Sequence, residues 1–339
     1  MTGSSPAIAV GEASQPLVSI ITPAYNRAHY LAEVIESVLN QDYPATEYIV
    51  LDDGSTDGTW NIIAGFGDRI RAFRHPNMGE TQTMNRGLEL ATGEIIGVVN
   101  SDDPLLPGAI RAAVEALAAH PELMVVYPDW AMIDEKGETV EEIRTFDYNY
   151  LDMLRWHHCV PGPGAFFRRS VPERLHGRDP QFRWVADFDF WLRAGLLGPF
   201  ARIPRKLATF RFHRSSASVS AKGAAMAAEH IRLVKKIYAL PDLPPEVRRI
   251  RREAFGSAHY IAGCVCGPDY PWTRKRHFLM ALAYSPLKYL REYRERLSTV
   301  VLPDLLGFVL RPSSVPRRIY RAIRWLGSRA KRMLGRAGD

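Results

Sequence analysis

The stretch YIVLDDGSTDGT, residues 48–59, ends an apolar run with two adjacent carboxylates. A second stretch, EIIGVVNSDD at residues 94–103, repeats the pattern with Asp102 and Asp103 at its end. In an open α/β sheet, ligands bind beyond the carboxyl ends of parallel strands, so side chains that follow such strands face the site. Two neighbouring carboxylates repel each other, and a cation compensates for this repulsion. Both acidic pairs are therefore predicted to face one metal-assisted phosphate or nucleotide site.

Short β-rich runs alternate with helical patterns around these two stretches. The predicted strands are residues 17–22, 46–51, 70–74, 94–99 and 123–127, and the predicted helices are residues 29–41, 59–66, 81–91 and 107–119. This alternation is typical of βαβ units, and we expect a mainly parallel sheet flanked by helices.

Composition limits the class of protein. With 339 residues, 46% of them hydrophobic, the chain can bury a full core. Three cysteines fit neither a disulfide framework nor a zinc knuckle, and residues 1–15 show no secretory signal, which together favour the cytoplasm. Residues 311–339 hold nine basic residues and one acidic residue, a net charge of +8. Because the whole chain carries +7, the first 310 residues carry a net charge of −1. This distribution argues against a nucleic-acid-binding body.

The turn after the first predicted strand is TPAYNR, residues 22–27. It lacks the glycines that a dinucleotide-binding loop or a P-loop needs for close approach to phosphates. It offers instead an aromatic ring at Tyr25 and a cation at Arg27. These two side chains suit a nucleotide base and a diphosphate.

Four ordered motifs carry a resemblance to a known family. They are SIITPAYNRAHYLAEVIESVLNQ, YIVLDDGSTDGT, NRGLELATGEIIGVVNSDD and ADFDFWLR, spread over residues 16–220. Together they resemble the family 2 glycosyltransferases of the GT-A fold, of the type found in bacterial polysaccharide biosynthesis, which take a sugar from a nucleotide diphosphate donor. The resemblance implies a Rossmann-like α/β domain in two halves, a nucleotide-sugar-binding half (16–130) and an acceptor and catalytic half (131–222).

The resemblance also implies roles for individual side chains. It assigns Pro23, Tyr25 and Arg27 to the nucleotide pocket. It makes Asp53 the partner of the base, which is expected to be uracil, and brings Asn85 near the donor phosphates or sugar.

The segment NSDD, residues 100–103, occupies the position of the family's D-x-D-D motif, with Asn100 in place of the first aspartate. The resemblance implies that Asp102 or Asp103 holds Mg²⁺ or Mn²⁺, while Ser101 and Asp102 contact the nucleotide. His213, in a segment resembling the family's late R-x-H, would complete the metal site.

A cation on carboxylate oxygens meets the charge that develops on a leaving diphosphate. The acceptor hydroxyl also needs a base, and Asp187 falls on the position of the family's catalytic carboxylate. The apolar residues around Asp187 predict a partly desolvated side chain. A single base acting through the acceptor predicts inversion at the anomeric carbon.

Residues 223–339 are predicted to form a helical region. Residues 319–333 combine apolar residues at helical spacing with arginines, which is typical of a basic amphipathic helix on an anionic membrane surface. We therefore expect a peripheral protein at the inner face of the cell membrane, with a glycan or polyprenyl-linked acceptor. A helix packed on the catalytic domain and an unfolded tail are the alternatives, and residues 1–15 are expected to form a disordered lead-in.

Other interpretations stay open at this point. Each acidic pair also fits a turn followed by a helix cap, Asp187 fits the polar face of an amphipathic helix, and His213 fits a structural histidine. A sugar-1-phosphate nucleotidyltransferase shares the fold class, although it should carry a glycine-rich phosphate loop. A non-catalytic nucleotide-sugar or glycan-binding scaffold is the third candidate.

Overall fold

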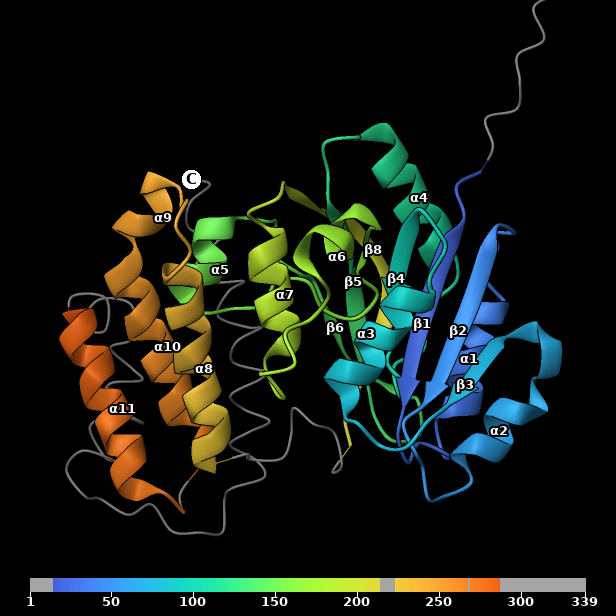
Figure 1. Cartoon of the computed structure of the whole chain (residues 1–339), viewed down its shortest axis with the longest axis horizontal. Coiled ribbons are helices and arrows are strands. Elements are labelled where there is room, and N and C mark those ends of the chain that lie inside the picture. The colour runs from blue at the N-terminus through green and yellow to red at the C-terminus, as the bar shows by residue number, and fades with distance from the viewer. Residues whose placement is uncertain (1–14, 214–222, 268, 287–339) are drawn as a thin grey trace, which may run out of the picture.

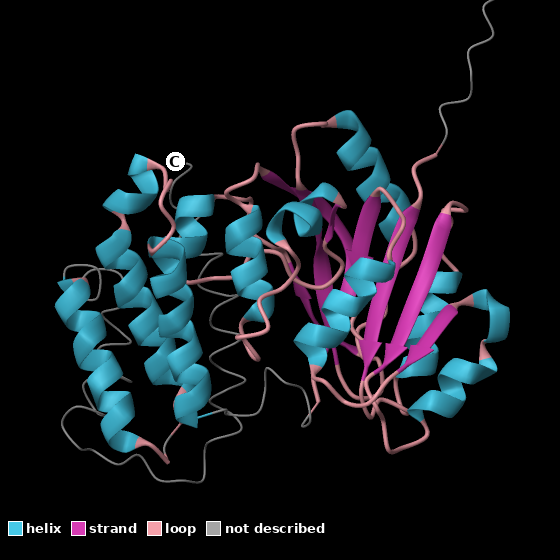
Figure 2. Cartoon of the chain, in the orientation of Figure 1, coloured by secondary structure: helices cyan, strands magenta, loops and turns pink. Residues whose placement is uncertain are grey.

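The computed structural model describes residues 15–213, 223–267 and 269–286. One mixed sheet forms the centre of the molecule, in the order β3-β2-β1-β4-β7-β5-β6, and β8 pairs with β5 (Figures 1 and 2). The strands are β1 (Val18–Ala24), β2 (Thr46–Asp52), β3 (Arg71–Arg74), β4 (Ile95–Val98), β5 (Val125–Ile133), β6 (Thr139–Ile143), β7 (Phe166–Arg168) and β8 (Phe200–Arg211).

The first four strands run parallel, as expected from their βαβ pattern. Beyond β4, strand β7 enters antiparallel between β4 and β5, and β6 is antiparallel to β5. The pairing of β5 with β8 is again parallel, so the prediction of a mainly parallel sheet flanked by helices is confirmed. The antiparallel strand β7 was missed because three residues are too few to leave a periodic pattern. β1 also extends through Pro23, which is buried within the strand, so the expected proline turn there is wrong.

Helices cover both faces of the sheet, and each face has its own hydrophobic core. Ile20 of β1 packs with α1 and α4, while its neighbour Ile21 packs with α3 and the helices that follow β7. Alternate residues of a strand point to opposite faces, so one apolar run supplies both cores. The helices of this part are α1 (Leu31–Leu39), α2 (Thr59–Gly65), the 3-10 turn η1 (Gly67–Arg69), α3 (Glu80–Leu90), α4 (Ala109–Ala119), α5 (Tyr150–Trp156), α6 (Ser170–Leu175) and α7 (Ala186–Ala194).

The C-terminal helices lie together beside α5 and α7 (Figure 1). They are α8 (Gly223–Tyr238), α9 (Pro245–Arg249), α10 (Arg251–Val265) and α11 (Pro271–Tyr284). Ile250 separates α9 from α10. The predicted lead-in falls almost wholly on residues 1–14, and the basic amphipathic tail falls on residues 311–339; both lie outside the described residues.

No helix in the described ranges combines the length and the apolar composition needed to cross a membrane.

The proposed boundary at residue 130 falls inside β5, so the two halves of the catalytic domain share that strand.

Candidate active site

The first acidic pair turns into the protein. Asp52 is fully buried, and its Oδ1 accepts a hydrogen bond from the backbone N–H of Ser55 at 3.0 Å. Asp53 is 3% exposed, and its two oxygens accept from the N–H groups of Met78 (2.7 Å) and Gly79 (3.0 Å). The expectation that both acids of this pair face the site is therefore wrong for Asp52. Asp53 shapes the loop that leads into α3, and its contact with a nucleotide base stays a prediction.

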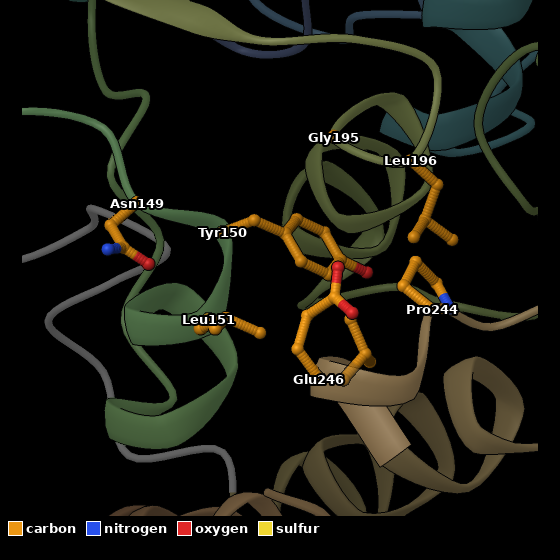
Figure 3. A pocket seen from close by; sticks show the side chains of 8 residues that line it. Asn149, Tyr150, Leu151, Gly195, Leu196, Pro244 and Glu246 are labelled. Atoms are coloured by element: carbon orange, nitrogen blue, oxygen red, sulfur yellow. The ribbon is translucent and has the colours of Figure 1, made fainter. Parts of the chain in front are cut away.

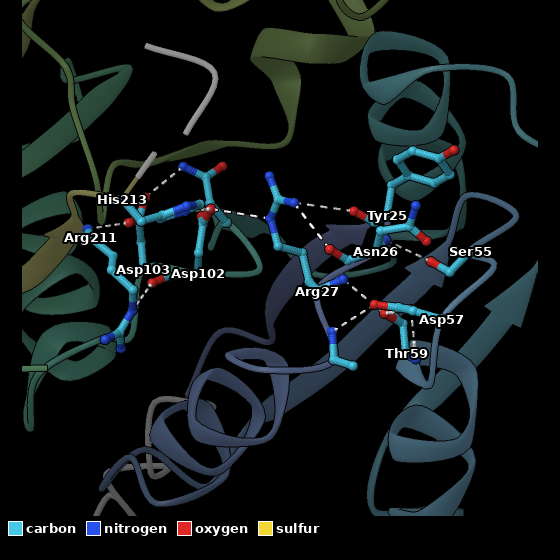
Figure 4. Close-up of polar contacts among 12 residues, drawn as sticks. Tyr25, Asn26, Arg27, Ser55, Asp57, Thr59, Asp102, Asp103, Arg211 and His213 are labelled. Carbon is cyan, nitrogen blue, oxygen red and sulfur yellow. Dashed lines mark hydrogen bonds and ion pairs between the residues drawn. The ribbon is translucent and has the colours of Figure 1, made fainter. Parts of the chain in front are cut away.

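The second acidic pair is divided between the site and the protein interior (Figure 4). Asp102 keeps 15% of its side chain exposed, and its Oδ2 lies 3.2 Å from Arg27 Nε and 3.0 Å from His213 Nε2. Asp103 is 5% exposed; its Oδ1 accepts from the backbone N–H of Arg211 (2.7 Å) and its Oδ2 from Asn100 Nδ2 (2.9 Å). Asp102 is thus the accessible acid, and Asp103 ties its loop to β8.

The burial of Asp103 changes the pKa of its carboxyl group. Removal from water, and next the neighbouring Asp102 carboxylate, raise the pKa of Asp103 to about 7, whereas the hydrogen bonds from Asn100 and Arg211 act in the opposite direction. Arg211, although only 1% exposed, is well paired: its Nε donates to the carbonyl of Asp102 (3.0 Å) and its Nη2 to Glu33 (2.6 Å). The asparagine that replaces the family's first aspartate therefore acts as a donor to Asp103.

The geometry at Asp102 fits a hard divalent cation. Two cis ligands of an octahedral Mg²⁺ at 2.0–2.1 Å lie about 3 Å apart, and Asp102 Oδ2 and His213 Nε2 are separated by that distance. His213 is 3% exposed, so its ring is held in place. In the described part of the chain, no group of three or more His, Cys, Asp and Glu side chains could hold a metal ion. Substrate oxygens and water would have to complete the shell, and a role for Asp103 as a ligand stays a prediction.

The turn after β1 is held against the loop after β2. Asn26 has a positive φ of 52°, its N–H donates to Ser55 Oγ at 2.9 Å, and the N–H of Arg27 donates to Thr59 Oγ1 at 2.8 Å. The serine and threonine of the GSTDGT segment therefore fix the turn that presents Arg27 to Asp102. Tyr25 is 45% exposed, and its stacking on a nucleotide base stays a prediction.

Asn85 and Ser101 are placed differently from each other. The amide of Asn85 is engaged with the backbone of Arg178, accepting from its N–H (2.7 Å) and donating to its carbonyl (2.8 Å). Asn85 thus positions Arg178, and its predicted proximity to the donor stays a prediction. Ser101 is buried, 7% exposed, directly before Asp102.

Sequence reasoning missed Glu80, the first residue of α3. Its side chain is 59% exposed, and its Oε1 lies 3.5 Å from Arg178 Nη1. The protein that surrounds it raises its pKa, the Arg178 guanidinium lowers it, and the carboxylates of Asp187 and Asp102 raise it further. Glu80 therefore lies within electrostatic range of both acids. An acid in the first turn of a helix is common, because it complements the helix dipole, so the sequence carried no signal for this position.

Asp187 is the second residue of α7, and its side chain is exposed. The expectation of a partly desolvated carboxylate is therefore wrong; the aromatic residues next to it in the sequence, Phe188 and Phe190, turn into the core. Burial, and next the Asp187 carboxylate, hold the pKa of the nearby Cys159 thiol well above its usual value. The Asp187 carboxylate also raises the pKa of Glu80, and its place beside Asp102 and Arg27 stays a prediction.

A hollow of about 290 Å³ lies elsewhere, between the start of α5, the end of α7 and the start of α9 (Figure 3). None of the predicted site residues lines it; its walls are Asn149, Tyr150, Leu151, Gly195, Leu196, Pro244, Glu246 and Val247. The predicted side chains that contact one another, Arg27, Asp102 and His213, therefore lie outside this hollow.

Comparison with known proteins agrees with this arrangement. Residues 19–175 match the model of the family described as glycosyl transferase family 2. These residues form a family 2 glycosyltransferase domain. A Rickettsia felis protein called an uncharacterized glycosyltransferase is 30% identical over 223 residues, which is 60% of this chain and 35% of the relative. The Pasteurella multocida hyaluronan synthase is 28% identical over 214 residues, which is 61% of this chain and 22% of the synthase. The chain therefore spans about a third or less of the length of these two relatives.

Solved structures establish the GT-A fold. Residues 1–349 of Staphylococcus aureus TarS in complex with UDP-GlcNAc superimpose with a TM-score of 0.66 at 16% identity, covering 90% of this chain and 92% of that one. The mannosyltransferase PcManGT from Pyrobaculum calidifontis, solved with GDP-Man and Mn²⁺, gives a TM-score of 0.57 at 20% identity, covering 87% of this chain and 86% of that one. Because identity is low, these likenesses concern the fold alone.

Proposed function

We propose that this family 2 glycosyltransferase moves a sugar from a nucleoside diphosphate donor, a UDP-sugar, to a hydroxyl of a glycan or lipid-linked acceptor, with inversion. The observation that carries the proposal is the cluster of Arg27, Asp102 and His213, which come from separate parts of the chain and meet at Asp102 Oδ2, at 3.2 and 3.0 Å. A transferred sugar has to lie between its leaving diphosphate and the attacking hydroxyl. Asp102 would serve the leaving diphosphate, and Asp187 would serve the attacking hydroxyl.

On the donor side, Arg27 and Asp102 would bind the diphosphate end, and Tyr25 would stack on the base. Asp102 and His213 would hold Mg²⁺ or Mn²⁺, which supplies Lewis-acid stabilisation of the leaving diphosphate when bound. Arg27 Nε, 3.2 Å from Asp102, adds a second positive charge beside the same oxygen. TarS was solved with UDP-GlcNAc and PcManGT with GDP-Man and Mn²⁺, which supports this part of the proposal.

On the acceptor side, Asp187 would accept the proton of the attacking hydroxyl at its exposed carboxylate. Glu80 lies in range of both Asp187 and Asp102, so its carboxylate would accept hydrogen bonds from hydroxyl groups of the transferred sugar. Arg178, held by Asn85, would fix the orientation of Glu80.

Membrane association belongs to the same proposal. The nine basic residues after residue 310 would bind anionic headgroups and bring the enzyme to a lipid-linked acceptor at the inner face of the cell membrane. Exposed Trp272 and Leu279 on α11, 80% and 54% exposed, add apolar contacts of the kind that interfacial helices use. Sedimentation with anionic vesicles should fail after truncation at Leu310, and equal sedimentation of the truncated chain would contradict the role of the tail.

The function is tested by measuring thermal stability against a panel of nucleoside diphosphates and nucleotide sugars, with Mn²⁺ or with EDTA. A ligand that binds only the folded state raises its stability by about 2.7 kcal/mol at a hundred times its dissociation constant. We expect UDP-sugars to raise the melting temperature in Mn²⁺ and to lose most of that effect in EDTA. Donor turnover is then measured for the stabilising sugar nucleotide. Stabilisation by no nucleotide under either condition would contradict the proposal.

A further inference from the structure

The start of α7, which carries Asp187, is not fixed by a cap of its own. Val185 occupies the N-cap position and makes no side-chain capping hydrogen bond. The first turn of a helix leaves backbone N–H groups without intrahelical partners, and such a helix end frays unless other groups hold it. One first-turn N–H, that of Phe188, donates to Asp187 Oδ1 at 2.7 Å, and the segment before α7 is held by another part of the chain.

The residue that holds this segment is Glu229 of α8, a carboxylate that is only 4% exposed. Its two oxygens accept hydrogen bonds from the N–H of Arg183, at 3.0 and 3.1 Å, and Oε2 also accepts from the N–H of Trp184 at 2.8 Å. Arg232, one turn further along α8, contributes a guanidinium 3.4 Å from Oε1. Hydrogen bonds to a charged acceptor are stronger than those between neutral groups, so this contact fixes the backbone three residues before Asp187.

A second contact from α8 holds α7 itself. Lys236 lies seven residues after Glu229, two helical turns along the same face of α8. Its ammonium group contacts Asp179 Oδ2 and Asp189 Oδ1, each at 2.7 Å, and Asp189 is fully buried two residues after Asp187. Helix α8 therefore contacts the chain on both sides of Asp187, through Glu229 before it and through Lys236 after it. Figure 1 shows α7 and α8 lying side by side.

We propose that α8 positions the catalytic base, with Glu229 and Lys236 as its positioning residues. The inference rests on the proposed function, in which Asp187 is that base. A general base works only within hydrogen-bond reach of the proton it removes, and a displacement of about 1 Å can cost a hundredfold in rate. The C-terminal helical region is then part of the catalytic apparatus, because it sets where Asp187 meets the acceptor hydroxyl.

The test is Glu229→Gln in the full chain, since glutamine keeps the shape of the side chain but has one acceptor oxygen in place of two. We expect kcat to fall about tenfold to a hundredfold with the donor KM unchanged within twofold, because no donor-side residue contacts Glu229 among the described residues. Lys236→Gln should show the same division between kcat and KM.

Glu47→Gln is the matched control. Glu47 also accepts backbone N–H groups of a loop, those of Thr92 (2.6 Å) and Gly93 (3.3 Å), but it lies near the amino end of β2, away from the site. It should lower the melting temperature and leave kcat unchanged. A purely structural role of Glu229 predicts the same behaviour as Glu47, and that result would overturn the inference.

A double-mutant cycle separates this inference from the proposed function. If Glu229 acts through Asp187, the change in kcat from Glu229→Gln should largely disappear in an Asp187→Asn background. A full kcat effect that persists without Asp187 would overturn the positioning role while leaving the base in place. Undiminished turnover by Asp187→Asn alone would overturn the base assignment and the inference together.

Discussion

The two sides of the candidate site are held in place by different means. The proposed donor-side residues lie on loops at the carboxyl ends of adjacent parallel strands and are fixed by short polar contacts between neighbouring loops, such as Asn26 to Ser55. The segment that carries Asp187, the proposed base, begins a helix without a side-chain cap and is held by contacts from α8, more than forty residues further along the chain. The difference indicates that strand order positions the proposed donor-side residues, whereas the position of the proposed base depends on the C-terminal helices.

The largest effect on kcat is expected from replacing Asp187, the proposed base. Asp187→Asn should lower kcat by about a thousandfold, within the range of general-base contributions, and leave donor binding within twofold. Steady-state kinetics with calorimetric titration of the donor would measure both quantities. The substitution removes an exposed carboxylate, so the melting temperature should stay close to that of the wild type. A parallel loss of donor affinity would place Asp187 on the donor side and contradict the division between donor-side residues and the base.

The two acids of the second pair should separate into a functional and a structural residue. Asp103→Ala leaves the N–H of Arg211 and the amide of Asn100 without their acceptor, so unfolding should become easier by about 2 kcal/mol. Asp102→Asn should leave the unfolding free energy nearly unchanged while removing the response of donor binding to Mn²⁺. Urea unfolding and donor titration with and without Mn²⁺ check this division. An exchange of the two phenotypes would contradict the assignment of Asp102 as the accessible acid.

Acid should weaken the C-terminal side of the molecule. Burial lowers the pKa of His230 and of His259 to about 4, with nearby His277 acting in the same direction. The unfolded chain, with histidine pKa values near 6.5, binds more protons than the folded chain between these values, so stability falls as pH drops from about 6.5 towards 4. Each histidine should account for about 2 kcal/mol at pH 5 relative to pH 7.

The measurement is the urea midpoint across this pH range for the wild type and for His259→Gln. The raised pKa of Asp103 acts in the opposite direction over part of the range, so the variant is compared with the wild type at each pH. The pH slope should be shallower in the variant. Equal slopes would contradict a buried neutral His259.

The smallest effect concerns sugar recognition. Glu80→Gln should weaken binding of the nucleotide sugar about tenfold, which corresponds to about 1.4 kcal/mol, and leave binding of the nucleoside diphosphate unchanged. Competition titrations with the two ligands measure the difference. A shift confined to the pH profile of kcat would mean that Glu80 acts on Asp187 and not on the sugar, whereas equal weakening of both ligands would place it at the diphosphate.

Much of the donor half could be predicted from the sequence, since each strand ends in a recognisable motif. The βαβ alternation predicted the first four strands, with bounds that differ from the structure by one or two residues at most ends. The direction of each acid within a motif could not be predicted in this way. Asp53 turns towards the Met78 and Gly79 backbone and Asp103 towards Arg211, and neither partner is near in sequence.

The strands that follow β4 were harder to predict, because their places in the sheet also depend on residues far apart in the chain. β7 has only three residues, too few for a period-2 pattern, and its position between β4 and β5 is decided by pairing across the sheet. Glu80 and Glu229 were also missed, because an acid on a helix looks the same in sequence whether it faces solvent, a cleft or a backbone donor. Burial and partners distinguish these cases, and both depend on the folded chain.

The sequence by itself determined the family resemblance, the positions of the first four strands along the chain and the candidate acids of the site, because these follow from local periodicity and from recognisable motifs. Tertiary structure alone decided that Asp102 faces outward while Asp103 is buried, and that α8 holds the segment that carries Asp187. The physical reason is that a carboxylate takes the direction in which its hydrogen-bond donors lie, and here those donors come from residues far apart in the chain.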